Sequence, residues 1–134
     1  LLDTGSTLAV TYVDQYGHFF RFGPFVFVMS RLRVSAISAA GTGNLEISGM
    51  PYASALPSGM TGSSGFTSVM PVAASDFTPT VADFGGLIAD VRATTTNMVL
   101  RQVGSGNSRT LLPSNSLATN AQFDFAGWYV AGFA

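Results

Sequence analysis

The sequence predicts an all-β domain, a sandwich or barrel of eight or nine antiparallel strands. Apolar positions alternate with polar ones, turn residues recur about every ten positions, and helical periodicity is hard to find. The 134 residues are enough for one domain with its own core and too few for two. We therefore treat residues 1–134 as a single domain.

The first half of the chain predicts four strands, at Thr7–Val13, His18–Phe22, Phe25–Ser38 and Asn44–Ser48. Turn chemistry at Asp14–Gly17 separates the first two. The third begins with a run that is apolar on both faces, Phe25–Met29, and a subunit interface would cover the second face. In the fourth, alternation places Leu45 and Ile47 inward and Glu46 outward.

The second half predicts four more strands, at Phe66–Ala73, Gly86–Ala93, Asn97–Val103 and Gln122–Phe133. In the second of these, Asp90 and Arg92 are expected on the solvent face. The Ser-, Gly- and Pro-rich segment Pro57–Gly65 is expected to be a loop, and Ser105–Ser108 a tight hairpin turn.

Charge and cysteine content argue against several classes of function. Only 10% of the residues are charged, against roughly 25% in typical soluble domains, and the net charge is −1. Binding to nucleic acid needs several cationic side chains on one face, so we do not expect this chain to bind nucleic acid. The absence of cysteine excludes disulfides and thiolate metal sites. A weakly charged surface rich in hydroxyls and amides suits neutral ligands such as glycans, and a passive structural surface equally well.

The two ends of the sequence and its longest apolar run give expectations about localisation and about the length of the whole protein. Arg31 and Arg33 interrupt that run, so no segment is long enough to insert into a membrane. The chain shows no signal peptide and no initiator Met. We expect a fragment of a longer chain.

One motif resembles a catalytic signature. Leu1-Leu2-Asp3-Thr4-Gly5-Ser6 matches the aspartic-protease pattern, in which two aspartates share one proton. Retroviral-type proteases carry one such motif per subunit and act as homodimers. Here no strand precedes the motif, no convincing flap is visible, and the second conserved element of those enzymes is missing. We expect a capped turn, and keep a homodimeric protease using Asp3-Thr4-Gly5 as the alternative.

Other catalytic and metal patterns are weaker. His18 is the only histidine and lies beside Gly17 and Phe19 on an expected strand, which favours a packing or surface role. No Gly-x-Ser-x-Gly elbow joins a strand to a helix. The aspartates at positions 76, 83 and 90 do not have the spacing of a Ca²⁺ loop. We expect no catalytic residue outside the Asp3 alternative, no metal and no cofactor.

Six residues are candidates for ligand binding. Arg31 and Arg33 share one strand face and could clamp the carboxylate of an acidic sugar, whereas a solvated face or an inter-subunit pair with Glu46 or Asp90 is the alternative. Trp128 and Tyr129, with Phe125 nearby, could stack on sugar rings or seal a core or interface. The loops Tyr52–Gly65 and Ser105–Ser108 add Tyr52 and Asn107.

Two blocks of sequence resemble a known family. Gly17-His18-Phe19-Phe20-Arg21-Phe22-Gly23 precedes the strand Phe25–Val28, and Gly41–Tyr52 ends in Gly-Met-Pro-Tyr. Their order and spacing resemble the C-terminal domains of bacteriophage tail fibres and tailspikes, as does the closing segment Phe125–Tyr129. The motifs cover about a third of the chain. His18 and Pro24 depart from the residues more usual in that family, which blurs any transfer of surface function.

The resemblance implies a jelly-roll-like β-sandwich that forms a homotrimer at the tip of a fibre. It implies an extracellular virion protein of the phage tail that trimerises the fibre and binds a host cell-surface glycan as receptor. The shared motifs contain no catalytic residue, so none is carried over. A further alternative is a trimerising cap on an upstream polysaccharide-degrading domain.

Overall fold

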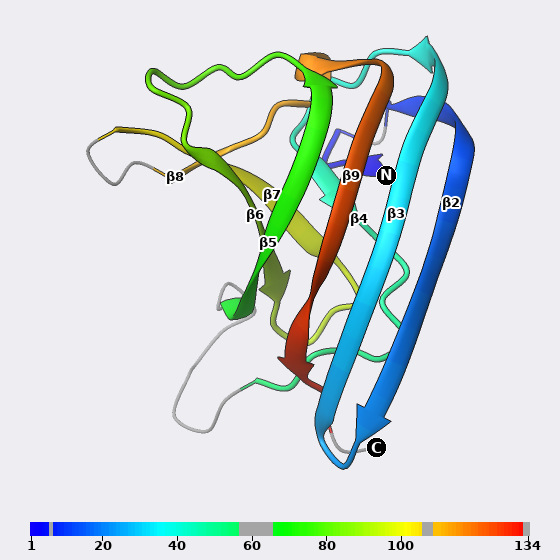
Figure 1. The fold of residues 1–134 in the computed structure, drawn as a ribbon, viewed down its shortest axis with the longest axis vertical. Coiled ribbons are helices and arrows are strands. Elements are labelled where there is room, and N and C mark those ends of the chain that lie inside the picture. Colours follow the sequence, from blue (N-terminus) through cyan, green and yellow to red (C-terminus); the bar gives the residue numbers. More distant parts are fainter. Residues whose placement is uncertain (6, 57–65, 106–108, 133–134) are drawn as a thin grey trace.

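The computed structural model describes residues 1–5, 7–56, 66–105 and 109–132 (Figure 1). It confirms an all-β, antiparallel fold. The strands are β1 (Leu2–Asp3), β2 (Ala9–Phe22), β3 (Phe25–Ala39), β4 (Leu45–Ile47), β5 (Phe66–Phe77), β6 (Gly86–Arg92), β7 (Met98–Val103), β8 (Arg109–Leu111) and β9 (Leu117–Val130). A short 3-10 turn at Ser114–Ser116 precedes β9. No helix in the described part of the chain is long and apolar enough to cross a membrane.

The nine strands found among the described residues belong to one hydrogen-bonded sheet. Its order is β1-β4-β7-β6-β5-β9-β3-β2, and β8 pairs with β7 beside this path. The sheet curls into a half-barrel, in which the long strands β5, β9, β3 and β2 form one side (Figure 1). The structure thus shows a curled antiparallel sheet, and the jelly-roll-like sandwich stays a prediction.

The first two predicted strands form one strand. The turn expected at Asp14–Gly17 is wrong, because β2 pairs with β3 along its whole length and Gly17 lies opposite Ser30. Shifts of register between Ala9 and Asp14 show that β-bulges absorb the irregular positions. The actual reversal is the two-residue loop between β2 and β3, where Gly23 has a φ of 57°.

Most other boundaries differ from the expected ones by one to three residues, and two differ by more. β5 continues past Ala73 to Phe77, and β9 begins at Leu117, well before the expected Gln122. The short strands β1 and β8 were not expected from the sequence. Two- and three-residue strands carry too few alternating positions to give a recognisable period.

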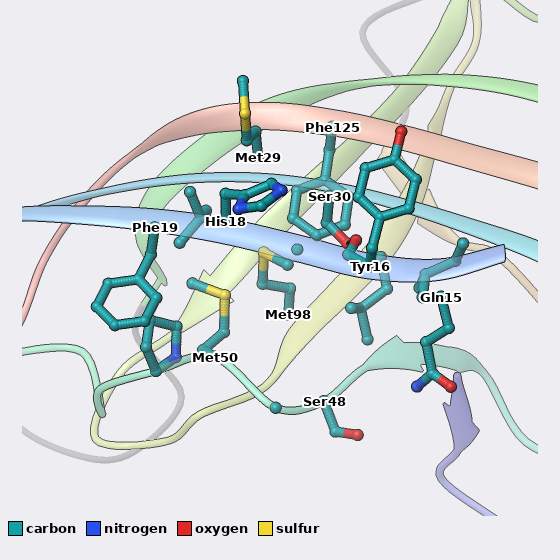
Figure 2. Close-up of a pocket in the computed structure, with 16 residues that line it drawn as sticks. Gln15, Tyr16, His18, Phe19, Met29, Ser30, Ser48, Met50, Met98 and Phe125 are labelled. Carbon is teal, nitrogen blue, oxygen red and sulfur yellow. Dashed lines mark hydrogen bonds between the residues drawn. The ribbon is translucent and has the colours of Figure 1, made fainter.

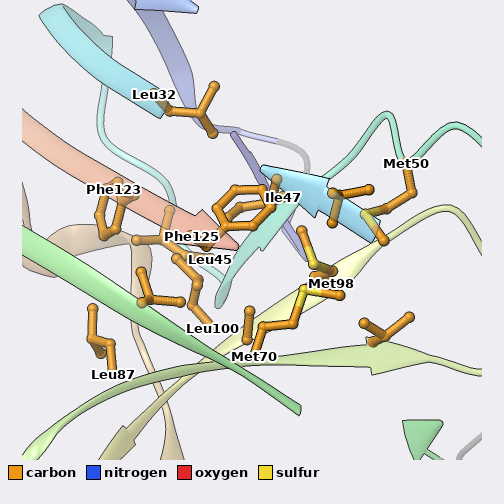
Figure 3. Packing of buried hydrophobic residues seen from close by; sticks show 14 of the residues in the cluster. Leu32, Leu45, Ile47, Met50, Met70, Leu87, Met98, Leu100, Phe123 and Phe125 are labelled. Atoms are coloured by element: carbon orange, nitrogen blue, oxygen red, sulfur yellow. The ribbon is translucent and has the colours of Figure 1, made fainter. Parts of the chain in front are cut away.

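The core lies inside the curl (Figure 3). Val26, Val28, Leu32 and Val34 of β3 are all buried, as alternation along the strand predicts. They belong to the same cluster as buried residues of β4, β5, β7 and β9, among them Leu45, Ile47, Met70, Met98, Leu100, Phe123 and Phe125. Each such side chain contributes roughly 1.5–3 kcal/mol when it is fully buried.

Two carboxylates expected at the surface are buried instead. Glu46 is only 6% exposed, and its oxygens accept hydrogen bonds from Arg92 Nη1 at 2.8 Å and Asn97 Nδ2 at 3.2 Å. Asp90 is 3% exposed and forms an ion pair with Arg101 Nε at 2.7 Å. Alternation predicts which face a residue occupies but does not predict whether that face is covered.

Gly127 in β9 provides a test of the close packing between β9 and β5. A Cβ atom at this position would lie 2.6 Å from Cγ of the buried Met70. We expect Gly127→Ala to lower the free energy of unfolding by roughly 1–3 kcal/mol through overpacking. Urea unfolding measures the change.

Gly17→Ala is the matched control, since the new Cβ would lie 3.5 Å from the Met29 carbonyl, an ordinary contact. We expect this variant to be neutral or slightly stabilising. Equal stability of the two variants would contradict the packing seen at Gly127.

Candidate functional site

The carboxylate of Asp3 is enclosed by backbone amides. Its Oδ1 accepts hydrogen bonds from the amides of Thr7 at 2.8 Å and Leu8 at 2.9 Å. Its Oδ2 accepts from the amides of Thr42 and Gly43, both at 3.0 Å, and from Thr7 Oγ1 at 3.2 Å. The Leu8 amide is the largest of the causes that hold the pKa of Asp3 well below its usual range, with the amides of Gly43 and Thr7 adding to it.

The rest of the Asp-Thr-Gly motif also makes structural contacts. The Thr4 hydroxyl accepts from the Asn44 amide at 3.0 Å, and the Thr4 amide donates to the Asn44 carbonyl at 3.1 Å. Gly5 lies so close to Thr42 that a Cβ atom would be 2.5 Å from Thr42 Oγ1. The motif ties the N-terminal segment to the Thr42–Asn44 segment, and this geometry favours a structural role for Asp3.

We predict that Asp3→Asn lowers the melting temperature by roughly 5–10 °C at pH 7, because an amide would set an N–H donor against backbone donors. The lowered pKa means that Asp3 stabilises the fold above about pH 4, the pKa of an unfolded aspartate. That contribution disappears as the pH falls through the lower pKa of the folded state. The difference between wild type and variant should therefore narrow below pH 4, as thermal melts followed by circular dichroism would show.

Asp83→Asn is the matched control. Asp83 is exposed and has a φ of 50°, which asparagine tolerates well. We expect no change in its melting temperature. A stable Asp3→Asn variant that had lost an acid-optimal proteolytic activity would overturn the structural role and restore the protease alternative.

The outer side of the sheet carries a row of exposed aromatic residues near the β2–β3 turn. Residues opposite each other in antiparallel strands share a face, so the pairings Phe22–Phe25–Val130 and Phe20–Phe27–Trp128 form two adjacent rows. We call these six residues the aromatic face. Phe22 is 72% exposed and Phe20 is 58% exposed.

The rings of the aromatic face contact one another. The ring of Trp128 lies 5.0 Å from that of Phe27 and 6.4 Å from that of Phe20, both centroid to centroid. Such pairs contribute about 0.5–1.5 kcal/mol beyond the area they bury. The face is therefore a pre-arranged surface across β2, β3 and β9.

Further along the same outer side, the rows become polar. Tyr16, Arg31 and Asp124 lie opposite one another on β2, β3 and β9. Arg31 Nε donates to Asp124 Oδ1 at 2.7 Å, and Nη2 donates to Oδ2 at 3.4 Å. Gln122 Nε2 also donates to Asp124 Oδ2, at 2.5 Å. The Arg31 guanidinium carbon lies 6.0 Å from the Tyr16 ring centre.

The Arg31–Asp124 pair corrects the sequence expectation for this arginine. Its partner lies on the neighbouring strand of the same chain, and Glu46 and Asp90 pair with other arginines. Hydrogen bonding to Asp124 raises the pKa of Arg31, and the same bond lowers the pKa of Asp124. As expected, Arg33 shares the face of Arg31, one row further along.

A shallow hollow of about 460 Å³ lies over these rows. It is lined by Tyr16, Met29, Ser30, Arg31, Pro71, Ala73, Asp124, Phe125 and Ala126. We call it the polar pocket after the Arg31–Asp124 ion pair, although most of its lining is apolar. Ala73 lies directly opposite Asp124 and therefore on the same face of the sheet. The small side chains of Ala73 and Ala126 leave room for the hollow beside Asp124. The pocket combines one ion pair, one exposed aromatic ring and an apolar floor.

A second hollow, also about 460 Å³, opens along the free edge of β2 (Figure 2). It lies between the β2 residues 15–19 and the segment 47–51, and Met98 and Phe125 are part of its lining. In Figure 2, Met50 and Met98 lie between β2 and the segment that carries Ser48. This hollow is the open seam of the half-barrel, and its lining, like that of the polar pocket, is mostly apolar.

The structure separates the two aromatic residues expected to act together. Trp128 is 49% exposed on the aromatic face, whereas its neighbour Tyr129 is 2% exposed and points into the core. The Tyr129 hydroxyl donates to the Tyr52 carbonyl at 2.9 Å and accepts from the Tyr52 amide at 3.2 Å. Tyr129 is thus a structural residue, because adjacent residues of a strand point to opposite faces.

The remaining candidates have separate positions. The ring of Tyr52 packs edge-on against Phe19 at 5.8 Å, and the Arg21 guanidinium carbon lies 4.4 Å from its centre. Asn107 and the loop Pro57–Gly65 lie outside the described residues. Among the described residues, no group of three or more histidine, aspartate or glutamate side chains could hold a metal ion.

Sequence reasoning missed Tyr16, Phe20, Phe27 and Asp124 as site residues. Phe20 and Phe27 are equally far from the Gly23-Pro24 turn, and a two-residue hairpin loop would have paired them. The same register pairs Tyr16 with Arg31, but the incorrect turn at Asp14–Gly17 concealed it. Nothing in the sequence near Asp124 indicates its partner, which lies 93 residues away.

Comparisons of the chain with protein-family models, with curated proteins and with solved structures gave no match.

Proposed function

We propose that this chain is a non-enzymatic, homotrimeric receptor-binding module of a phage tail fibre or tailspike. The observation that carries the proposal is the aromatic face, which exposes phenylalanine and tryptophan side chains on three adjacent strands. Contiguous apolar surface of this kind marks an interface or a binding site. The resemblance of the hairpin sequence to phage fibre domains supplies the trimer and the extracellular virion location.

The position of the aromatic face supports self-association. It lies beside the free edge of β2, a 14-residue strand at the end of the sheet. An exposed edge strand with apolar neighbours tends to pair or pack with another chain unless something covers it. A second and third copy of the chain would cover both the edge strand and the aromatic face. They would bury the rings of Phe20 and Phe27, which already pack against Trp128.

The curled sheet is compatible with the jelly-roll-like sandwich of the proposal. Core residues of β3 and β9 pack in the same cluster as those of β4 and β7. Two opposed layers of strands with one core between them are the packing arrangement of a sandwich. The half-barrel would be such a sandwich with its layers joined along one side.

The glycan part of the proposal rests on the chemistry of the outer side. The chain has only 10% charged residues and exposes several hydroxyl-bearing and aromatic side chains, which suit neutral sugars. The polar pocket beside the aromatic face contains such groups and remains at the margin of the proposed interface. The receptor would be a polysaccharide of the bacterial cell surface.

The first test is the solution mass of the chain by light scattering after size exclusion. We predict a trimer, and a shift towards monomer in Phe20→Thr and Trp128→Thr, because each substitution removes a ring from the aromatic face. Circular dichroism would confirm that each variant is folded.

Val13→Thr is the matched control, since Val13 is 56% exposed but lies outside the aromatic face. It should leave the mass unchanged. A wild-type monomer would overturn the self-association proposal, and a dimer unaffected by Phe20→Thr and Trp128→Thr would overturn the assignment of the aromatic face as the interface.

A further inference from the structure

We propose that the polar pocket binds one uncharged hexose unit, held by the Arg31–Asp124 ion pair and stacked on Tyr16. The inference rests on the proposed function, which makes the ligand a glycan. It adds the place where that glycan binds and specifies that the bound sugar unit is uncharged. Three features of the pocket support it: its shape, its hydrogen-bonding groups and its balanced charge.

The shape suits a single flat ring. The floor consists of small or apolar side chains, including Ala73, Ala126 and Pro71, supplied by β5 and β9. Tyr16 is 49% exposed and stands at the pocket on the edge strand β2. One face of a hexose carries mainly C–H groups, and an aromatic ring with a polar tip is a suitable platform for such a face.

The ion pair offers both donors and acceptors. A guanidinium group has five N–H donors, and Asp124 accepts two from Arg31, so three remain. The side chains of Arg31 and Asp124 are 42% and 32% exposed, so solvent and ligand reach both. Two adjacent sugar hydroxyls can each donate to the carboxylate or accept from the guanidinium, which matches this pair of groups.

The charge of the pocket favours an uncharged sugar over an acidic one. Asp124 balances the charge of Arg31 at 2.7 Å, and in the next row Asp14 lies opposite Arg33. A sugar carboxylate approaching Arg31 would also approach the Asp124 carboxylate, and like charges at close range repel. The structure therefore argues against the acidic-sugar clamp that the two arginines suggested.

The test compares methyl glycosides of glucose, galactose, mannose and N-acetylglucosamine with glucuronate and N-acetylneuraminate. Binding is followed by amide chemical shifts in NMR spectra of the wild-type chain. We expect at least one neutral glycoside to bind with a dissociation constant on the order of millimolar, as befits a ligand of this size. Its shift changes should centre on β2, β3 and β9 around Tyr16, Arg31 and Asp124. The two acidic sugars should bind at least tenfold more weakly.

Three variants separate the contributions. Tyr16→Ala should weaken the neutral sugar at least tenfold, whereas Tyr16→Phe should retain most of the binding because the ring remains. Asp124→Asn leaves Arg31 without its counter-charge, so it should reverse the preference towards glucuronate. Arg33→Gln, one row away, is the control and should leave neutral binding unchanged.

Several outcomes would overturn the inference. These are stronger binding of the acidic sugars by the wild type, neutral binding that is insensitive to Tyr16→Ala, and no binding of any neutral glycoside. A change of solution mass in Tyr16→Ala or Asp124→Asn without a change in sugar binding would instead make the pocket part of the subunit interface. The proposed function is tested separately, by the solution mass and by titration of the wild-type chain with whole bacterial polysaccharide. If the pocket binds no hexose but the chain is a trimer that binds the polysaccharide, the inference fails and the proposed function stands.

Discussion

The register of β3 between β2 and β9 is the constraint on which the rest of the structure depends. Alternation along β3 sends Val26, Val28 and Leu32 into the core and the intervening residues to the outer side. Because β2 and β9 pair with β3 without interruption from Phe25 to Arg33, each outer residue acquires a partner on both sides. A slip of one residue would move the core side chains to the surface and scatter the aromatic face.

At the opposite edge of the sheet, the hydrogen bonds that the Asp3 carboxylate accepts hold β1 in place. β1 and β4 lie at the far end of the strand order from β2, and the loop that leads into β2 returns to them through the Asp3 carboxylate. The charge of Asp3 is thereby stabilised by amides that would otherwise lack strand partners. The motif that resembles a catalytic signature thus connects β1, the segment that leads into β2 and the Thr42–Asn44 segment through hydrogen bonds.

The aromatic face and the polar pocket lie on the same outer side of the sheet, and they differ in the chemistry of their side chains. Towards the β2–β3 turn the rows are aromatic and suited to burial against another chain. Away from the turn the rows carry the Arg31–Asp124 ion pair and the Tyr16 hydroxyl, which remain favourable in contact with water. In the function that we propose, assembly and ligand recognition therefore use different residues of β2, β3 and β9.

The sequence by itself determined the class of fold, the approximate positions of most strands, and the burial of Leu32 and Val34 in β3, because these follow from a period of two and from turn chemistry. It also placed Arg31 and Arg33 on one face correctly. Only the tertiary structure decided that β2 is continuous, that Glu46 and Asp90 are buried, and that Arg31 pairs with Asp124. These features depend on contacts between residues far apart in the chain, and local periodicity carries no information about which distant strand becomes a neighbour.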